Sequence, residues 1–284
     1  MSIEMEICRT VEATRSTVAQ LRERGDVGLV PTMGALHAGH MNLVAQAMAE
    51  NASVVTSIFV NPTQFGDPKD LETYPRDDEA DLAALRAAGV AAVFMPDVAE
   101  MYPEGDETIV ETTQLANVFH GLVRPGHFRG VATVVSKLLN IVQPDRVYFG
   151  QKDYQQLAVI RRMVRDLRMA VDVRDVATAR DADGVALSSR NKRLTSEHRA
   201  AAPVLNQALV EAEAALLDGA AVEAIVSMIK ARVAGEPLAV LKAIDIVDAA
   251  TFEPATGDFR GTLGMMISAQ FGDVLLIDQR EVTR

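Results

Sequence analysis

One short segment near the amino terminus strongly constrains the fold that this chain can adopt. An apolar run over residues 27–30 has the character of a buried strand, and a turn with two glycines follows it over residues 31–40. The apolar spacing of residues 41–48 then predicts a helix. The order of strand, glycine-bearing turn and helix is typical of an α/β protein with a parallel sheet.

The same alternation continues through the first two thirds of the chain. We expect strands over residues 27–30, 53–60, 90–95, 146–149 and 171–176, and helices over residues 9–24, 40–49, 77–88, 131–142 and 155–167. Strands that alternate with helices predict a Rossmann-like, doubly wound parallel sheet.

The pattern changes beyond residue 179. An alanine-rich stretch over 200–234 reads as helix almost throughout, and strands follow over residues 242–247, 263–271 and 274–277. Helices followed by strands indicate an α+β arrangement. We therefore predict a Rossmann-like domain over 1–178, which binds the nucleotide and the substrate, and a smaller C-terminal α+β domain over 179–284 that closes over the site.

The charge and composition of the chain exclude several classes of function. The net charge is −11, whereas a protein that grips nucleic acid normally carries a basic face. No run approaches the roughly 20 apolar residues of a membrane span, and the acidic first residues do not resemble a signal peptide. A single cysteine, Cys8, cannot form an internal disulfide. We expect a cytoplasmic protein without nucleic-acid or membrane partners.

The turn over residues 31–40 carries two histidines where a helix begins. Unpaired amides and the macrodipole at a helix start attract anions such as phosphate. His37 and His40 are three residues apart, so they share one face of the first turn. A metal site, simple packing and a helix cap are the alternatives, but one cysteine and three other histidines are few partners for structural zinc. The pattern favours phosphate binding.

Polar side chains also follow two other predicted strands. Asn61 and Gln64 come after the strand 53–60, and Lys152 comes after the strand 146–149. Ligands of open α/β sheets bind at the carboxyl ends of the strands. Amides suit hydroxyl and carboxylate groups, although Asn61 before a proline is also a common turn residue. Lys152 suits phosphate, although a salt bridge to Asp153 is the alternative.

Two further segments carry groups that suit anions. Ser188, Ser189 and Arg190 place two hydroxyls beside a guanidinium, which suits a polyphosphate, although Ser188 also suits a helix N-cap. Arg124 lies among glycines ahead of a predicted helix, where an anion contact and a tight entry turn are both consistent with the spacing.

Several motifs together resemble one enzyme family. The HxGH of residues 37–40 resembles the signature of the nucleotidylyltransferase superfamily, and the longer string PTMGALHAGH resembles the pantothenate synthetases. The segments 124–130, 150–153 and 184–191 match the same family, and the resemblance covers most of residues 27–195. It implies a ligase that joins pantoate to β-alanine with ATP, through a pantoyl adenylate, and releases pyrophosphate and AMP.

The resemblance also implies the site residues. The catalytic residues would be His37, His40, Lys152, Ser188, Ser189 and Arg190. The ATP-binding residues would include these six and Met33, Gly34, Ala35, Leu36, Ala38, Gly39, Gly150, Gln151, Asp153, Ala179 and Leu187. Pantoate and β-alanine would contact Asn61, Gln64, Arg124 and Gln156.

Magnesium and self-association are further expectations. Mg²⁺ would accompany ATP, and some family members have adjacent acids where this chain has Ala80 and Asp81, so Asp81 is the candidate metal ligand. An acid near a helix start is also favoured by the macrodipole alone. The family is dimeric, which implies a homodimer.

Two other functions fit parts of the pattern. A nucleotidylyltransferase that acts on a phosphate ester would need basic groups in place of Asn61, Gln64 and Gln156. A non-catalytic ATP-binding regulator would keep the phosphate site but would need no polar pocket for an acid.

Overall fold

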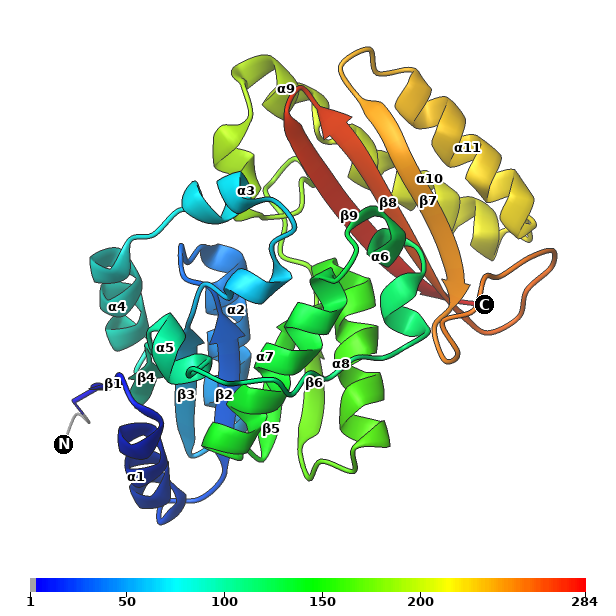
Figure 1. Cartoon of the computed structure of the whole chain (residues 1–284). Coiled ribbons are helices and arrows are strands. Elements are labelled where there is room, and N and C mark those ends of the chain that lie inside the picture. Colours follow the sequence, from blue (N-terminus) through cyan, green and yellow to red (C-terminus); the bar gives the residue numbers. More distant parts are fainter. Residues whose placement is uncertain (1–3) are drawn as a thin grey trace. The chain divides into compact units, whose positions relative to one another are not determined.

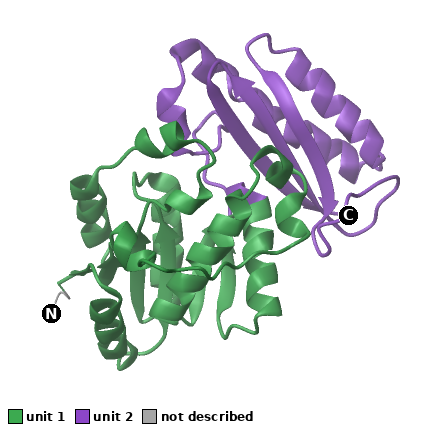
Figure 2. Ribbon diagram, viewed as in Figure 1, with its two compact units in different colours: residues 1–150, 155–176 green, residues 151–154, 177–284 purple. Residues whose placement is uncertain are grey.

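The computed structural model describes residues 4–284 and divides the chain into two compact units (Figures 1 and 2). Unit 1 comprises the chain up to Gly150 together with Gln155–Val176, and unit 2 comprises Gln151–Tyr154 and Ala177–Arg284. The short segment Gln151–Tyr154 lies within the range that we predicted for the first domain, yet it groups with unit 2.

Unit 1 contains a six-stranded sheet in the order β1-β4-β3-β2-β5-β6, and every neighbouring pair is parallel. The strands are β1 (Glu6–Cys8), β2 (Val27–Thr32), β3 (Ser53–Ile58), β4 (Ala92–Phe94), β5 (Arg146–Gly150) and β6 (Asp172–Val176). This arrangement confirms the predicted α/β class. The edge strand β1 was missed because three residues carry too little pattern to predict a strand.

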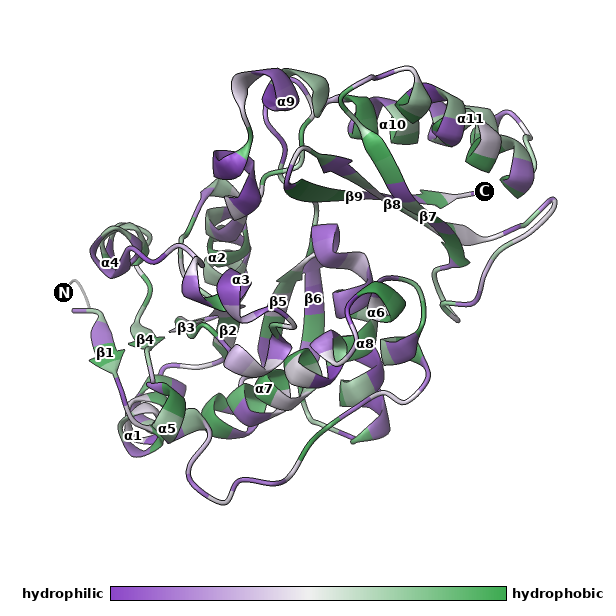
Figure 3. Cartoon of the chain, turned by 45° about the horizontal axis from the view of Figure 1, so that its top comes forward, coloured by the Kyte–Doolittle hydropathy of each residue, from purple (hydrophilic) through white to green (hydrophobic). Residues whose placement is uncertain are grey.

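Helices cover both faces of this sheet. They are α1 (Val11–Arg22), α2 (Ala38–Glu50), α3 (Pro68–Glu72), α4 (Asp78–Ala87), α5 (Val98–Met101), α6 (His120–Val123), α7 (His127–Val142) and α8 (Tyr154–Asp166). Leu43, Val44 and Ala47 of α2 and Leu85 of α4 pack in one apolar core with residues of β2, β3, β4 and β5. Helices α1 and α7 contact each other and β2. The strands carry much of the apolar sequence (Figure 3). The short 3₁₀ segments are η1 (Pro62–Gln64), η2 (Leu115–Asn117), η3 (Gln151–Asp153) and η4 (Ser189–Arg193).

Unit 2 contains a three-stranded antiparallel sheet in the order β7-β8-β9. Its strands are β7 (Val240–Asp248), β8 (Thr262–Phe271) and β9 (Val274–Thr283), and its helices are α9 (Ser196–Ala201), α10 (Val204–Leu217) and α11 (Val222–Ala234). The helical stretch 200–234 is interrupted at residues 202–203 and again at Gly219, whose φ of +102° suits glycine. Apolar residues of α10, α11 and the three strands form one core.

Strand β9 extends beyond the predicted range 274–277. The prediction stopped early because the second half of the strand is polar. The strand pairs with β8 from Phe271–Val274 to Thr262–Thr283, so it continues well past residue 277. Asp278, which hid this continuation, is 3% exposed and accepts hydrogen bonds from the Arg180 guanidinium at 2.7 and 2.9 Å. Within residues 4–284, no helix is long and apolar enough to cross a membrane.

Candidate active site

The turn after β2 is folded around a buried carboxylate. Thr32 donates its hydroxyl to the carbonyl of Ser57 at 2.7 Å and accepts the amide of Gly34 at 3.2 Å. Asp81 of α4 accepts the amides of Ala35 and Leu36 at 2.8 and 2.7 Å. Burial raises the pKa of Asp81, and the two amide hydrogen bonds oppose that shift.

The two histidines cap the start of α2 reciprocally. His37 is the N-cap, and its Nδ1 accepts the amide of Gly39 at 3.1 Å. His40 is the third helical residue, and its Nδ1 accepts the amide of His37 at 3.3 Å. The two rings lie 4.1 Å apart between centroids at 36°. The helix cap that we gave as an alternative and the predicted placement of both side chains on one face therefore occur together.

The direction of these hydrogen bonds assigns the tautomer of each neutral ring. A backbone N–H can only donate, so both Nδ1 atoms act as acceptors and a neutral imidazole carries its proton on Nε2. The expectation of unpaired turn amides needs correction, because the amides of residues 34–37 and of Gly39 already have acceptors within the protein. The neutral tautomer places an Nε2–H group on each ring beside the positive end of α2.

Asn61 lies in a hydrogen-bonded cluster that follows β3. Its Nδ2 donates to Gln64 Oε1 at 3.0 Å and to the carbonyl of Gly130 at 3.2 Å. Its Oδ1 accepts the hydroxyls of Tyr102 at 2.8 Å and Thr63 at 3.0 Å. Since Asn61 is 1% exposed and makes four hydrogen bonds, its amide supports the neighbouring residues of η1.

Gln64 is the amide of this region that retains hydrogen-bonding capacity. Its Nε2 contacts the sulfur of Met33 at 3.2 Å, a weak acceptor. The backbone carbonyl oxygen of Gln64 lies 2.9 Å from Nδ1 of His127. Nε2 of His127 in turn lies 3.3 Å from Nη1 of Arg124. The structure thus brings Arg124 close to Gln64 through His127, a residue that we did not predict although it lies in the matching segment 124–130.

Gly130 allows α7 to approach this cluster closely. A Cβ atom at Gly130 would lie 2.5 Å from the carbonyl oxygen of Thr63 and 2.7 Å from the amide nitrogen of Gln64. Backbone cannot yield to such an overlap as a flexible side chain can. The close packing of α7 on η1 therefore requires glycine at this position.

The two adjacent glutamines at the start of α8 differ in their surroundings. Gln155 is 4% exposed, donates to the carbonyls of Leu115 and Val118 at 3.0 and 2.8 Å, and accepts the amide of His120 at 3.1 Å. It therefore holds the segment that leads into α6. Gln156, which we predicted to contact pantoate, is half-buried.

The four remaining predicted phosphate ligands belong to unit 2, and three of them line one recess. Lys152, Ser188, Arg190 and Asn191 line one recess of this unit. Lys152 makes the predicted alternative ion pair with Asp153 at 3.4 Å. Ser188 is the N-cap of η4 and accepts the amide of Arg190 at 3.3 Å, so the alternative N-cap role also occurs.

Two segments contribute to that recess, the loop that carries Ser188 and the segment Gln151–Tyr154, and each is held by contacts within unit 2. The amide of Leu187 donates to the carbonyl of Ala179 at 2.9 Å, which closes the loop that leads to Ser188. Tyr154 anchors the segment Gln151–Tyr154, because its hydroxyl donates to Glu281 at 2.9 Å and its ring stacks on Phe252 at 5.8 Å. A Cβ atom at Gly264 would lie 2.3 Å from that ring, so the contact needs glycine.

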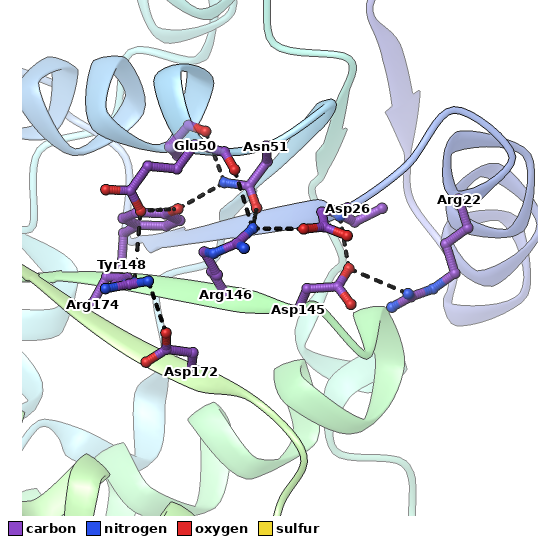
Figure 4. Close-up of polar contacts among 11 residues, drawn as sticks. Arg22, Asp26, Glu50, Asn51, Asp145, Arg146, Tyr148, Asp172 and Arg174 are labelled. Atoms are coloured by element: carbon purple, nitrogen blue, oxygen red, sulfur yellow. Dashed lines mark hydrogen bonds and ion pairs between the residues drawn. The ribbon is translucent and has the colours of Figure 1, made fainter.

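A polar network holds the opposite end of α2 (Figure 4). Tyr148 of β5 donates its hydroxyl to Glu50 at 2.9 Å and accepts Nδ2 of Asn51 at 2.7 Å. Arg146 donates to Oδ1 of Asn51 at 3.0 Å and to Asp26 at 2.9 Å. Burial is the main cause that raises the pKa of Tyr148 to about 12. This network was not predicted, since its members come from separate elements.

The chain is similar over almost its whole length to one family of ligases. The family model described as Pantoate-beta-alanine ligase matches residues 6–281. The pantothenate synthetase of Rhizobium etli is 49% identical over 280 residues, which cover 98% of this chain and 94% of the relative. That of Rhizobium rhizogenes is 50% identical over 282 residues, 99% of this chain and 97% of the relative.

Solved structures show the same similarity. The pantothenate synthetase of Thermus thermophilus superposes with a TM-score of 0.93 at 45% identity, covering 99% of this chain and 100% of the other. The pantoate-beta-alanine ligase of Francisella tularensis, described as a complex with beta-gamma ATP and beta-alanine, gives a TM-score of 0.80 at 34% identity. Here the alignment covers 98% of this chain and 97% of the other.

Proposed function

Because the chain belongs to the pantoate-beta-alanine ligase family, it is a ligase that joins pantoate to β-alanine with ATP, and we propose that the reaction runs through a pantoyl adenylate. In the first step the pantoate carboxylate attacks the α-phosphorus of ATP and pyrophosphate leaves. In the second step the amine of β-alanine attacks the acyl carbon and AMP leaves. Activation is needed because a free carboxylate is a poor acyl donor in water.

The arrangement of His37 and His40 is the observation that carries the proposed first step. Their Nδ1 atoms accept backbone amides, so their Nε2–H groups donate to phosphate oxygens at the positive end of α2. Donors held in place in advance stabilise charge that develops in a transition state without further reorganisation. In this proposal the protein supplies position and charge, and no side chain acts as a nucleophile.

Lys152, Ser188, Ser189 and Arg190 supply the remaining phosphate contacts in this proposal. A lysine acts as a point charge and an arginine as a planar fork, and both suit phosphate. Closure of unit 2 over the site would shield the reactive adenylate from water.

The amide groups favour a hydroxy acid over a phosphate ester as the second substrate. Gln64 and Gln156 are neutral and offer both donors and acceptors, which suits the hydroxyls and carboxylate of pantoate. Asn61 acts by holding Gln64, to which it donates at 3.0 Å. Arg124 would bind a carboxylate of either substrate.

Magnesium enters this proposal with the nucleotide. Among residues 4–284 no group of three or more histidine, cysteine, aspartate or glutamate side chains is arranged to hold a metal ion. Mg²⁺ prefers substrate phosphates, water and one or two carboxylates, so the triphosphate is its main ligand here. When bound, Mg²⁺ neutralises part of the phosphate charge. We further propose, from the family resemblance, that the enzyme is a homodimer of the cytoplasm.

Isotope transfer tests the adenylate directly. Pantoate labelled with ¹⁸O in its carboxylate is incubated with ATP, Mg²⁺ and β-alanine, and the AMP is analysed by mass spectrometry. The adenylate route places one labelled oxygen in AMP, because that oxygen remains on the α-phosphorus. The same enzyme should catalyse pantoate-dependent exchange between pyrophosphate and ATP without β-alanine. Unlabelled AMP together with no exchange would exclude the route.

A further inference from the structure

We infer that Asp81 is a positioning residue, which holds the turn that carries His37 and His40, and that it is not a magnesium ligand. The inference rests on the proposed function, in which these two histidines contact the phosphates of ATP. It assigns Asp81 a role different from the one implied by the family resemblance.

Both carboxylate oxygens of Asp81 are engaged by the turn. Oδ2 accepts the amide of Ala35 at 2.8 Å, and Oδ1 accepts the amide of Leu36 at 2.7 Å. Hydrogen bonds to a charged acceptor are stronger than those between neutral groups. Asp81 lies on α4, far from the turn in sequence, so these bonds tie the turn to a separate helix of unit 1.

The conformation of the turn depends on such an acceptor. Gly34 has a φ of +79° and Ala35 a φ of +50°, and a left-handed conformation is unfavourable for alanine. Successive amides in this conformation point into one concave nest, which in many proteins binds phosphate. Here the carboxylate of Asp81 fills the nest, and a Cβ atom at Gly34 would lie 2.9 Å from its Oδ2. The turn therefore encloses an anion that belongs to the protein.

The same burial argues against a metal at this carboxylate. Asp81 is 3% exposed. Mg²⁺ gives up its water molecules reluctantly and usually keeps several of them when a protein binds it. Since both oxygens of Asp81 already accept backbone amides and the side chain is almost without solvent access, this carboxylate is a poor ligand for such a hydrated ion.

The position of the turn determines where the two imidazoles point. Leu36, the second residue held by Asp81, directly precedes His37, which caps α2 and exchanges hydrogen bonds with the start of that helix. A turn released from Asp81 would loosen the N-cap, and the Nε2–H groups would lose their fixed direction. A displacement of about 1 Å in a catalytic group can lower a rate about a hundredfold.

The test compares Asp81→Asn with the control Asp78→Asn. Asparagine keeps the size of the side chain but presents an NH₂ group to one of the two amides, so one hydrogen bond is lost. Asp78 lies on the same helix, is exposed, and loses the same charge on substitution. We expect Asp81→Asn to lower kcat for adenylate formation about ten- to a hundredfold, with an unchanged half-saturating Mg²⁺ concentration. Asp78→Asn should leave kcat essentially unchanged.

A spectroscopic measurement without substrate separates the two roles. The chain has 5 histidines, so ¹⁵N-histidine NMR spectra can be resolved and assigned. We expect wild-type His37 and His40 to show the Nε2–H tautomer and Asp81→Asn to show a tautomer mixture at both rings, in the absence of ATP and Mg²⁺. If the proposed function failed, the wild type would show no pantoate-dependent exchange, whereas this readout would be unaffected.

A second variant covers the case in which Asp81→Asn folds poorly. Glycine adopts a positive φ without strain, so Ala35→Gly in the Asp81→Asn background should recover part of the lost kcat and of the fold measured by circular dichroism. Two results would overturn the inference. One is a large rise in half-saturating Mg²⁺ with unchanged histidine resonances, and the other is wild-type kcat and resonances in Asp81→Asn.

Discussion

The two regions that carry the predicted phosphate ligands are built in different ways. In unit 1 the histidine turn is enclosed by hydrogen bonds, because Thr32, Asp81 and the two imidazoles accept the amides of residues 34–37 and Gly39. In unit 2 Lys152 pairs with its neighbour Asp153, and Arg190 is half-buried. The first region is therefore held by a set of hydrogen bonds to backbone amides, whereas the second has the Lys152–Asp153 ion pair and the Ser188 cap.

Because of this difference, we expect substitutions in the two regions to affect stability and catalysis differently. In the histidine turn each imidazole uses Nδ1 for structure, and Nε2 is the atom that we propose to contact the phosphates. In the unit 2 recess we expect the charged side chains to contribute little to the fold, since the Lys152–Asp153 ion pair is partly solvent-accessible and such pairs are usually weak. Substitutions should therefore affect both folding and activity in the first region, but almost only activity in the second.

The largest effects are expected from substitutions of His37 and His40, and His37→Asn separates the structural role of one ring from its proposed catalytic role. Asparagine is a good N-cap, so the start of α2 and the free energy of unfolding should be preserved. The Nε2–H donor is lost, and we expect the rate of pantoate-dependent ATP–pyrophosphate exchange to fall about 10²–10³-fold. Exchange kinetics and urea unfolding measure the two quantities.

His37→Ala is the matched comparison, because alanine removes the cap as well. It should show a similar loss of rate and an additional loss of stability of about 1 kcal/mol. His40→Ala should also abolish adenylate formation while the fold remains. A near-normal exchange rate in His37→Asn or His40→Ala would remove that histidine from the proposed mechanism.

The next effect concerns the unit 2 recess. Lys152→Ala and Arg190→Ala should each reduce kcat/KM for ATP about a hundredfold, a size typical of a lost phosphate or transition-state contact. Their free energies of unfolding should change by less than about 0.5 kcal/mol, as for most surface substitutions. Lys192→Ala, an exposed neighbour in η4, is the control and should leave both quantities unchanged. A loss of stability without a change in kcat/KM would contradict the proposed division.

Gly130→Ala tests whether the hydrogen-bonded cluster of Asn61 and Gln64 also needs the close packing of α7 on η1. Its new Cβ would overlap the backbone of Thr63 and Gln64, so we expect a loss of stability of about 1–3 kcal/mol, as for other overpacked sites. KM for pantoate should rise because Gln64 would move. Gly66→Ala is the control, since Gly66 has no heavy atom within 4 Å of the added Cβ and no positive φ. Equal behaviour of the two variants would show that α7 tolerates displacement from η1.

The sequence was sufficient for those parts of the molecule that depend on local pattern. The strands β2, β3 and β5 are apolar runs and were predicted, as were α2 and α4, because periodicity is visible within a few residues. The HxGH turn was identified from its neighbours along the chain. The second half of β9 was missed because Asp278 is buried by an ion pair with Arg180, a partner that lies far away in sequence.

Within the candidate site, the hydrogen-bond partners of each side chain could not be predicted from its residue type. Asn61 and Gln64 have the same functional group, yet the amide of Asn61 makes four hydrogen bonds within the protein. Asp81 and its acidic neighbours look alike in sequence, but it is Asp81 that binds the turn amides of residues 35–36. Such differences arise from contacts between distant segments, and a single sequence carries no pattern for them.

The smallest effect at neutral pH is expected from Tyr148→Phe at the other end of α2. The hydroxyl links Glu50 and Asn51, so its removal should lower the free energy of unfolding by about 0.5–1.5 kcal/mol. The value of kcat should hardly change, because the reciprocal cap and Asp81 hold the catalytic end of the helix independently. A larger fall in kcat would mean that the histidine turn depends on both ends of α2.

The stability difference between the wild type and Tyr148→Phe should depend on pH, and the shifted pKa of Tyr148 gives the direction of that change. The pKa of Tyr148 is raised to about 12 in the folded protein, against about 10 for an unfolded tyrosine. Between these values the unfolded chain loses its proton first, so the contribution of Tyr148 is fully present below about pH 10 and is lost as the pH rises toward about 12. Urea unfolding at a series of pH values from about 9.5 to about 11.5 should therefore show the wild type losing its advantage over Tyr148→Phe, with other titrating groups cancelling in the comparison. An advantage that stayed constant or grew with pH would contradict the assigned burial of this hydroxyl and, with it, the anchoring of α2 by β5.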